Sequence, residues 1–324
     1  MKLLLVRFSS MGDIVLTSPV IRCLRSQLSD LELHVLTKEA FAGVYTVNPY
    51  IDKVFTIKDE LGEVVPLLKA ERYDRIIDLH RNLRSFGLWL RLRRPRSVFP
   101  KLNLRKWLLV RLHLDLMPEV HVVDRYFRAV RRLGVENDGL GLEFFIAPED
   151  EMDLHELPSD YHEGFVAMVT GGKHATKILP APKAAEVIRV LERPVLLLGG
   201  SEDYARAEEI IRLTDGRVFN GCGRYSLGQS ASLLRMADAV ITNDTGLMHI
   251  ASAFRKRTVS VWGNTVPALG MYPYQPGTED QVYLAEVKGL KCRPCSKIGF
   301  DRCPRGHFRC MEDQDTAIIA DRAR

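Results

Sequence analysis

The sequence has no hydrophobic run long enough to cross a bilayer, which argues against an integral membrane protein. Its first apolar stretch, residues 3–6, is only four residues long and is followed by Arg7. Such a run is too short for the core of a secretory signal peptide and is typical of a buried β-strand. We therefore expect a cytoplasmic chain, in which cysteine thiols are normally reduced.

Two chemical signatures are also missing, and a third occurs only in an unsuitable place. No G-x-G-x-x-G follows the first expected strand, so the dinucleotide-binding fingerprint is absent from its usual place. No pair of carboxylates stands out as flanking a scissile bond, which glycosidases require. An Asp-x-Asp occurs only at 313–315, near the C-terminus, where we do not expect a catalytic metal.

Positive charge is spread unevenly along the 324 residues, whose net charge is +5. Residues 81–132 hold fourteen Lys and Arg against three acidic residues, a net charge of +11. This asymmetry indicates an anionic partner, such as nucleic acid, a membrane surface or a phosphorylated substrate. A set of solvated helix faces would give the same composition.

The rest of the chain alternates short apolar runs with amphipathic stretches of helical length, the pattern of parallel sheets crossed by helices. An acid- and Pro-rich passage at 147–160 has the composition of a linker. We expect two Rossmann-like α/β domains, 1–155 and 156–324, facing each other across a cleft. The expected strands are 3–7, 33–37, 53–57, 75–79, 165–169, 195–198, 239–242 and 258–262, and the expected helices are 14–28, 182–191, 202–213 and 227–236.

The turn after the first strand, residues 8–13, reads Phe-Ser-Ser-Met-Gly-Asp. Ligands of open parallel sheets bind beyond the carboxyl ends of strands, so this turn is a candidate site. Gly12 allows a close backbone approach, and Asp13 opens the following helix. Asp13 is also a favoured helix N-cap residue and needs no catalytic role for that.

Three turns of the second half have the composition of an anion site. Residues 241–249 join a strand to a helix N-terminus, which attracts phosphate, and Gly246 leaves room for it. Asp244 suits a hydroxyl or a capping role, and His249 is either a ligand contact or a packed core residue. Residues 170–177 are rich in small and cationic residues without P-loop spacing, and Glu202 follows the next strand, where it suits ribose hydroxyls or a helix start.

Together these segments resemble glycosyltransferase family 9, which contains the lipopolysaccharide heptosyltransferases. The resemblance is carried, over nearly the whole chain, by Ser9-Ser10-Met11-Gly12-Asp13, by Lys177 before Pro180, by Gly199-Gly200-x-Glu202 and by Asp244-Thr245-Gly246-x-x-His249. It implies a GT-B fold, no metal in catalysis, and transfer of heptose from ADP-heptose with inversion to the inner core of lipopolysaccharide. Gly172 and Lys173 depart from relatives that carry hydroxyl residues at these positions.

The resemblance also implies roles for individual residues. Asp13 would be the general base, Lys177 would bind the diphosphate, and Glu202 would hold the ribose. The donor pocket would further include Ser226, Leu227, Asp244, Thr245, Gly246 and His249. Candidates for contacting the anionic glycolipid acceptor are Arg7, Arg84 and Arg105. A lipid-linked acceptor would explain the charge of the +11 segment, which would then contact the inner-membrane surface of a Gram-negative bacterium.

Four cysteines near the C-terminus form a separate cluster, Cys292, Cys295, Cys303 and Cys310, with His307 between the last two. They suggest a structural zinc site, a redox clasp or reduced thiols packed in a loop. Two other functions stay open at this point. The first is another two-domain nucleotide-sugar enzyme of the epimerase kind. The second is a non-catalytic protein that binds anions, for which a nucleic-acid partner is disfavoured because aromatic residues are sparse in 81–132.

Overall fold

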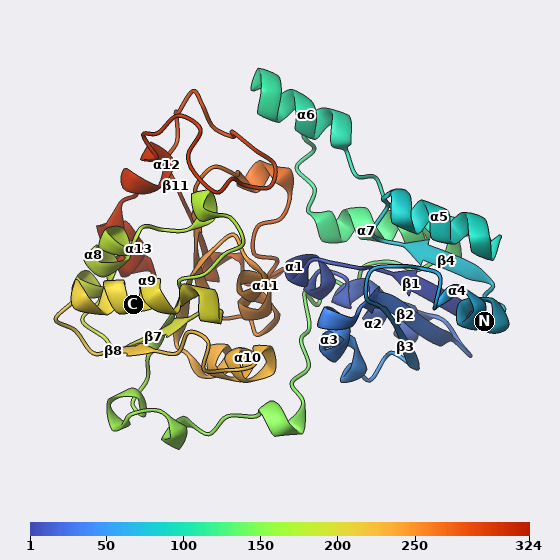
Figure 1. Ribbon diagram of the computed structural model, residues 1–324, viewed down its shortest axis with the longest axis horizontal. Coiled ribbons are helices and arrows are strands. Elements are labelled where there is room, and N and C mark those ends of the chain that lie inside the picture. The colour runs from blue at the N-terminus through green and yellow to red at the C-terminus, as the bar shows by residue number, and fades with distance from the viewer. The chain divides into compact units, whose positions relative to one another are not determined.

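The computed structural model describes all residues, 1–324, as two compact units (Figure 1). The first unit consists of Met1–Lys101 and Val120–Phe145, and the second of Leu102–Glu119 and Ile146–Arg324. Each unit is built on one parallel sheet, so the predicted pair of α/β domains is confirmed. No helix is long and apolar enough to cross a membrane.

The first unit has a five-stranded sheet in the order β3-β2-β1-β4-β5. All four pairings are parallel, and the central strand β1 is buried along Leu3–Val6, which explains its continuous apolar run. Helices α4 and α5 pack against the side of the sheet that carries Leu4 and Val6. The strands are β1 (Lys2–Val6), β2 (Glu32–Lys38), β3 (Lys53–Ile57), β4 (Arg75–Asp78) and β5 (Arg96–Val98). The helices are α1 (Met11–Val15), α2 (Ser18–Gln27), α3 (Ala42–Thr46), α4 (Val65–Ala70), α5 (Leu83–Leu92) and α7 (Val122–Val130).

The second unit has a six-stranded parallel sheet in the order β11-β10-β9-β6-β7-β8. Its largest apolar cluster joins the sheet to helices α8, α9 and α13. The strands are β6 (Val166–Val169), β7 (Val195–Leu198), β8 (Val218–Asn220), β9 (Ala239–Asn243), β10 (Arg257–Trp262) and β11 (Val282–Glu286). The helices are α6 (Asn103–Leu112), α8 (Ala181–Leu191), α9 (Tyr204–Arg212), α10 (Leu227–Met236), α11 (Gly246–Ala253), α12 (Arg309–Glu312) and α13 (Thr316–Arg322).

The helix predicted over 14–28 is wrong in its boundaries, because the chain forms two helices there, α1 and α2. Pro19 lies at the start of α2, where the N–H that proline lacks is not needed. Inside a continuous helix the same proline would remove a hydrogen bond and clash with the preceding turn. At the break between the two helices, the Thr17 hydroxyl donates a hydrogen bond to the Ile14 carbonyl at 2.7 Å.

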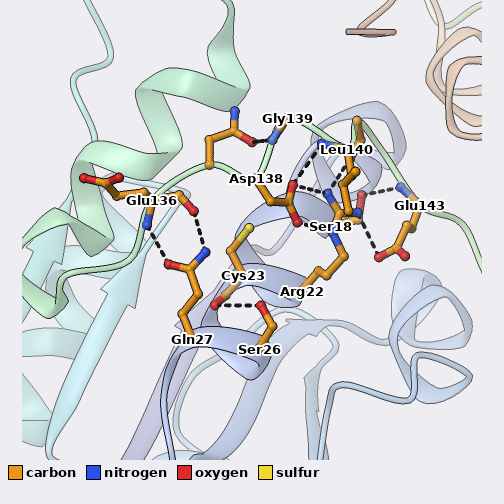
Figure 2. Close-up of polar contacts among 12 residues, drawn as sticks. Ser18, Arg22, Cys23, Ser26, Gln27, Glu136, Asp138, Gly139, Leu140 and Glu143 are labelled. Atoms are coloured by element: carbon orange, nitrogen blue, oxygen red, sulfur yellow. Dashed lines mark hydrogen bonds and ion pairs between the residues drawn. The ribbon is translucent and has the colours of Figure 1, made fainter. Parts of the chain in front are cut away.

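The passage that follows α7 is fastened to α2 by one buried arginine (Figure 2). Arg22 donates to both carboxylate oxygens of Asp138, at 2.8 and 2.7 Å, and forms a second ion pair with Glu143 at 3.0 Å. The guanidinium also donates to the Gly141 carbonyl at 2.9 Å. This cluster holds the last part of the first unit against its own core.

The acid-rich passage predicted as a linker is anchored to α10 in the second unit. Ser226, the N-cap residue of α10, donates to Asp150 at 2.6 Å, and Met152 N–H donates to the Ser232 hydroxyl at 3.0 Å. Arg235 pairs with Glu151. These contacts attach residues 150–152 of the passage to α10.

Candidate active site

Both sheets contain a topological switch point, where consecutive connections leave a strand in opposite directions. In the first unit β1 lies between β2 and β4, and in the second β6 lies between β7 and β9. The loops after β1 and β4 in the first sheet, and after β6 and β9 in the second, run in opposite directions. Ligands of such sheets bind in the crevice that this leaves at the carboxyl ends of the strands. The candidate site therefore has two parts, one after β1 and β4 and the other after β6 and β9.

At the first switch point Asp13 is held by three side chains. Its Oδ1 lies 2.6 Å from Arg7 Nη2 and 3.5 Å from the Tyr126 hydroxyl, and its Oδ2 accepts from the Ser10 hydroxyl at 2.9 Å. The Asp13 side chain remains 21% exposed, whereas that of Arg7 is 7% exposed. The carboxylate is thus fixed in orientation while still accessible.

Ser10 caps α1 in the extended conformation, and Asp13 is the third residue of that helix. The prediction that Asp13 opens the helix was therefore wrong by three positions. Asp13 instead completes a capping box, because its carboxylate also accepts from the Ser10 N–H at 3.3 Å. The short helix thus fixes the carboxylate through the same contacts that begin the helix.

Arg7, predicted to contact the acceptor, uses its donors inside the unit. Its Nε donates to the Ser9 carbonyl at 2.8 Å, and Nη1 donates to the Leu79 carbonyl and to the Tyr126 hydroxyl. Burial would lower the pKa of Arg7, but Asp13 and the neighbouring tyrosines raise it above its usual value. Arg7 therefore stays cationic and connects the loop after β1 to the loop after β4.

Two further side chains surround the aromatic ring of Phe8 in this turn. The His80 ring packs edge-on against it, with 5.0 Å between centroids, and the Arg84 guanidinium lies 5.8 Å from the ring centroid. Burial, followed by the charges of Arg7 and Lys101, lowers the pKa of His80 to about 4. Arg105 forms no ion pair; it lies exposed on α6, which belongs to the second unit.

At the second switch point Lys177 pairs with Asp244. Lys177 Nζ lies 2.6 Å from Asp244 Oδ2, and the Thr265 hydroxyl donates to the same oxygen at 3.0 Å. Thr245 is the N-cap residue of α11, which begins at Gly246. A lysine and a helix N-terminus thus meet where the sequence predicts an anion site.

Asn243, which was not predicted as a site residue, ties the end of β9 to the end of β6 at this switch point. Its Nδ2 donates to the carbonyls of Val169 and Gly171 at 3.1 and 3.3 Å, and its Oδ1 accepts from Leu179 N–H at 3.1 Å. A polar residue at the buried end of an apolar strand is the signal that could have identified it.

Asp203, next to the predicted Glu202, was also missed. It is buried, its pKa is raised by burial, and it accepts from Gly200 N–H at 3.0 Å. A Cβ at Gly171 would lie 2.1 Å from its Oδ2, so only glycine fits beside it in the loop after β6. Glu202 itself is exposed and its carboxylate lies over Gly200, where an added Cβ would be 2.2 Å from Oε2.

The remaining predicted donor residues lie at two helices. Ser226 caps α10, accepting from Gln229 N–H at 3.0 Å, and Leu227 is the first residue of that helix. His249 is buried in α11. In the loop before Lys177, a Cβ at Gly172 would lie 3.4 Å from Thr245 Cγ2, so this loop lies against the start of α11.

The cysteine-rich segment packs on the same loops. Arg293 donates to the carbonyls of Gly263 and Thr265, at 2.6 and 2.9 Å, and Phe300 N–H donates to the Thr176 hydroxyl at 2.8 Å. Thr265 is the residue that holds Asp244. The segment thus supports the loops of the Lys177–Asp244 pair through three hydrogen bonds that the sequence does not reveal.

Comparison with known proteins identifies the family. Residues 63–297 match the model of glycosyltransferase family 9 (heptosyltransferase). Lipopolysaccharide heptosyltransferase 1 of Campylobacter coli is 23% identical over 297 residues, which cover 82% of this chain and 84% of the relative. The Escherichia coli K12 protein of the same name is 26% identical, covering 83% and 90%.

Solved structures share the fold. E. coli ADP-heptose lps heptosyltransferase II superposes with a TM-score of 0.68 at 18% identity, covering 99% of this chain and 100% of that one. E. coli heptosyltransferase WaaC with ADP gives 0.62 at 22% identity, covering 87% and 92%. The predicted GT-B fold and glycosyltransferase activity are confirmed. The chain belongs to glycosyltransferase family 9, the heptosyltransferases.

Proposed function

We propose that the chain transfers heptose from ADP-heptose, with inversion, to a hydroxyl of the lipopolysaccharide inner core. The observation that carries the proposal is a single held carboxylate, Asp13, at the first switch point and a lysine, Lys177, at the second. Inverting transfer needs one base for the acceptor and one neutralising group for the leaving diphosphate. The names of the relatives, lipopolysaccharide heptosyltransferases, supply the transferred sugar and the acceptor, and the name of the solved E. coli ADP-heptose lps heptosyltransferase II supplies the donor.

In this mechanism Asp13 takes the proton of the acceptor hydroxyl. The freed oxygen attacks the anomeric carbon of the heptose from the face opposite ADP, and the carbon–oxygen bond to the β-phosphate breaks. The bonding electrons leave with ADP. Arg7 acts as a positioning residue, since it holds Asp13 Oδ1 and leaves the carboxylate partly exposed.

Lys177 would bind the diphosphate and stabilise the charge that develops on ADP. Asp244 holds the ammonium group in place, and Thr245 and Gly246 offer the N-terminus of α11 to phosphate. Glu202 would accept hydrogen bonds from the ribose. Ser226, Leu227 and His249 complete the donor side, with the first two near the adenine.

On the acceptor side, Arg84 is the candidate that lies over the ring of Phe8, in the turn that carries Asp13. Arg105 would contact acceptor phosphate from α6. The chain would work at the cytoplasmic face of the inner membrane of a Gram-negative bacterium, where the +11 segment faces anionic lipid.

The test is transfer by the purified chain from ADP-heptose to lipopolysaccharide that lacks heptose, followed by mass spectrometry and by ADP release. We expect a product one heptose heavier and one ADP per transfer. ADP-, UDP- and GDP-sugars tested in parallel define the donor. Conversion of ADP-heptose without an acceptor would instead indicate an epimerase, and steeply salt-dependent binding of nucleic acid without transfer would indicate the anion-binding alternative.

We also propose a structural metal ion at Cys292, Cys295, Cys303 and Cys310. Cys292 Sγ lies 3.7 Å from His307 Nε2, so a ring nitrogen stands beside the first of these thiols. Clustered thiols of this kind are soft ligands suited to zinc or iron. The glycosyltransferase TibC of E. coli, described as iron-containing, superposes with a TM-score of 0.57 at 14% identity.

The metal would brace the segment that holds Gly263, Thr265 and Thr176, and no step of transfer passes through it. Elemental analysis of the purified chain should find about one zinc or iron per chain, and Cys295→Ser with Cys303→Ser should remove it. A metal-free chain with four titratable thiols would show that the cysteines are simply packed.

A further inference from the structure

Helix α5 is apolar on two opposite faces. Its inner face packs on the first sheet through Leu88 and Leu92. Its outer face carries Leu83, Phe86 and Leu90, which are 90%, 43% and 52% exposed. Their spacing of three and four residues places them on one side of the helix, along about 10 Å of its length. The outer face of a helix in a globular protein is normally polar, so this stripe indicates a partner.

Unpaired cations flank the stripe at the C-terminal end of α5. A groove of about 460 Å³ there is lined by Lys69, Arg91, Arg93 and Arg94, together with Tyr73 and Leu90. No carboxylate lines the groove, and none of the four cations forms an ion pair. Their charge is therefore available to an anionic partner.

The stripe begins beside the proposed acceptor site. Helix α5 follows the carboxyl end of β4, and Arg84 in its first turn lies over the ring of Phe8. Phe8 belongs to the turn that carries Asp13. All of these residues belong to the first unit.

We propose that α5 lies in the surface of an anionic bilayer. Leu83, Phe86 and Leu90 enter the boundary between head groups and acyl chains, and the cations of the groove bind lipid phosphates. An apolar stripe flanked by arginines is the composition of helices that lie in a membrane interface. The inference rests on the proposed function, because a lipid-linked acceptor is embedded in such a bilayer and must reach Asp13.

The experiment is co-sedimentation of the full chain with vesicles of phosphatidylcholine, alone or mixed with phosphatidylglycerol. The wild-type chain should bind the anionic vesicles and release them at high salt. Leu83→Ser with Leu90→Ser should weaken binding by about tenfold or more, because the apolar contact is lost. Arg91→Glu with Arg94→Glu should abolish the preference for phosphatidylglycerol.

Matched controls carry the same changes elsewhere. Leu140→Ser with Leu213→Ser removes two exposed leucines outside α5, and Arg212→Glu with Arg217→Glu makes the same change of net charge. Both controls should bind vesicles as the wild-type chain does. Unchanged binding by the α5 variants, equal losses in the controls, or no binding to anionic vesicles by the wild-type chain would overturn the inference.

Transfer to a deacylated, water-soluble acceptor separates this inference from the proposed function. The Leu83→Ser, Leu90→Ser variant should transfer heptose to the soluble acceptor at the wild-type rate and lose transfer to acceptor embedded in vesicles. If the wild-type chain fails with the soluble acceptor, the proposed function fails. If the variant keeps full transfer to embedded acceptor, only the role of α5 fails.

Discussion

The two switch points share one strand order, and each holds one ion pair, but the more exposed charge of the pair differs in sign. In both units the first strand in sequence lies between the second and the fourth, and a buried polar side chain joins the loops that follow. Arg7 does so in the first unit and Asn243 in the second. The more exposed ion of the pair is the carboxylate, Asp13, in the first unit and, by a small margin, the lysine, Lys177, in the second.

This difference shows how one architecture provides two kinds of chemistry. The topology decides where polar groups gather, and the sign of the paired charges decides what they do there. A carboxylate suits the removal of a proton, and an ammonium group suits a leaving diphosphate. We therefore expect a substitution at the first switch point to impair proton removal from the acceptor, and one at the second to impair binding of the donor diphosphate.

Among variants that leave Asp13 and its carboxylate in place, the largest effect is expected from Arg7→Met, which removes the cation that orients Asp13. Transfer should fall about 100-fold, since a displaced base is no longer aligned with the acceptor. The free energy of unfolding should fall by about 2 kcal/mol, because Arg7 is buried while Asp13 is partly exposed. Denaturant unfolding and initial rates of transfer give the two quantities.

The control for Arg7 is Arg25→Met, which breaks the ion pair with Asp52 in the same unit. This variant should lose stability and keep its transfer rate per folded molecule. Equal rate losses in the two variants would mean that Arg7 has only a structural role.

Lys177→Ala should affect donor binding at the second switch point. We expect the affinity for ADP to fall about 10- to 100-fold, because a charge-assisted contact with phosphate is lost. Calorimetry with ADP measures this directly. Lys183→Ala, which removes a lysine paired with Glu186 on α8, should leave the affinity unchanged. An unaltered ADP affinity in Lys177→Ala would exclude the diphosphate role.

Asn243→Ala tests whether the bridging side chain in the second unit matters as Arg7 does in the first. The loss of three hydrogen bonds inside a buried region should cost about 2 kcal/mol of unfolding free energy. ADP affinity should fall severalfold because the loop after β6 is no longer tied to β9. Asn220→Ala, at the end of the edge strand β8, should destabilise the chain without changing ADP affinity. A similar loss of affinity in both variants would remove the special role of the switch point.

The smallest effect concerns pH and stability alone. The ion pair with Arg22, followed by other contacts, lowers the pKa of Asp138 to about 2. The unfolded chain therefore takes up this proton at higher pH than the folded chain, so the pair stabilises the fold above about pH 4. That contribution should disappear as the pH falls from 4 towards 2. Asp138→Asn should flatten this part of the stability curve, and an unchanged curve would contradict the assignment.

Much of the fold and part of the site could be predicted from the sequence. Buried strands β1, β6 and β9 are visible as apolar runs, and the segments that follow them mark Asp13, Lys177 and Asp244 as candidates. The break between α1 and α2 was missed, although Pro19 signals it, because the apolar periodicity continues through both helices.

The contacts that fix the site could not be predicted. Arg7 reaches the Leu79 carbonyl across 72 positions, and Arg293 reaches Thr265 across 28. Such pairings depend on which loops the sheet brings together, and residue type alone does not reveal them. Asp203 was missed for a related reason, since its burial depends on Gly171 and Gly199, which leave room for its carboxylate.

The central claim is that Asp13 serves the acceptor while the second unit binds the donor. The most direct test measures transfer and ADP affinity together in Asp13→Asn, which keeps the size of the side chain. We expect transfer to fall about 1000-fold and ADP affinity to stay at the wild-type value. Transfer at the wild-type rate, or a loss of ADP affinity as large as the loss of transfer, would contradict the account.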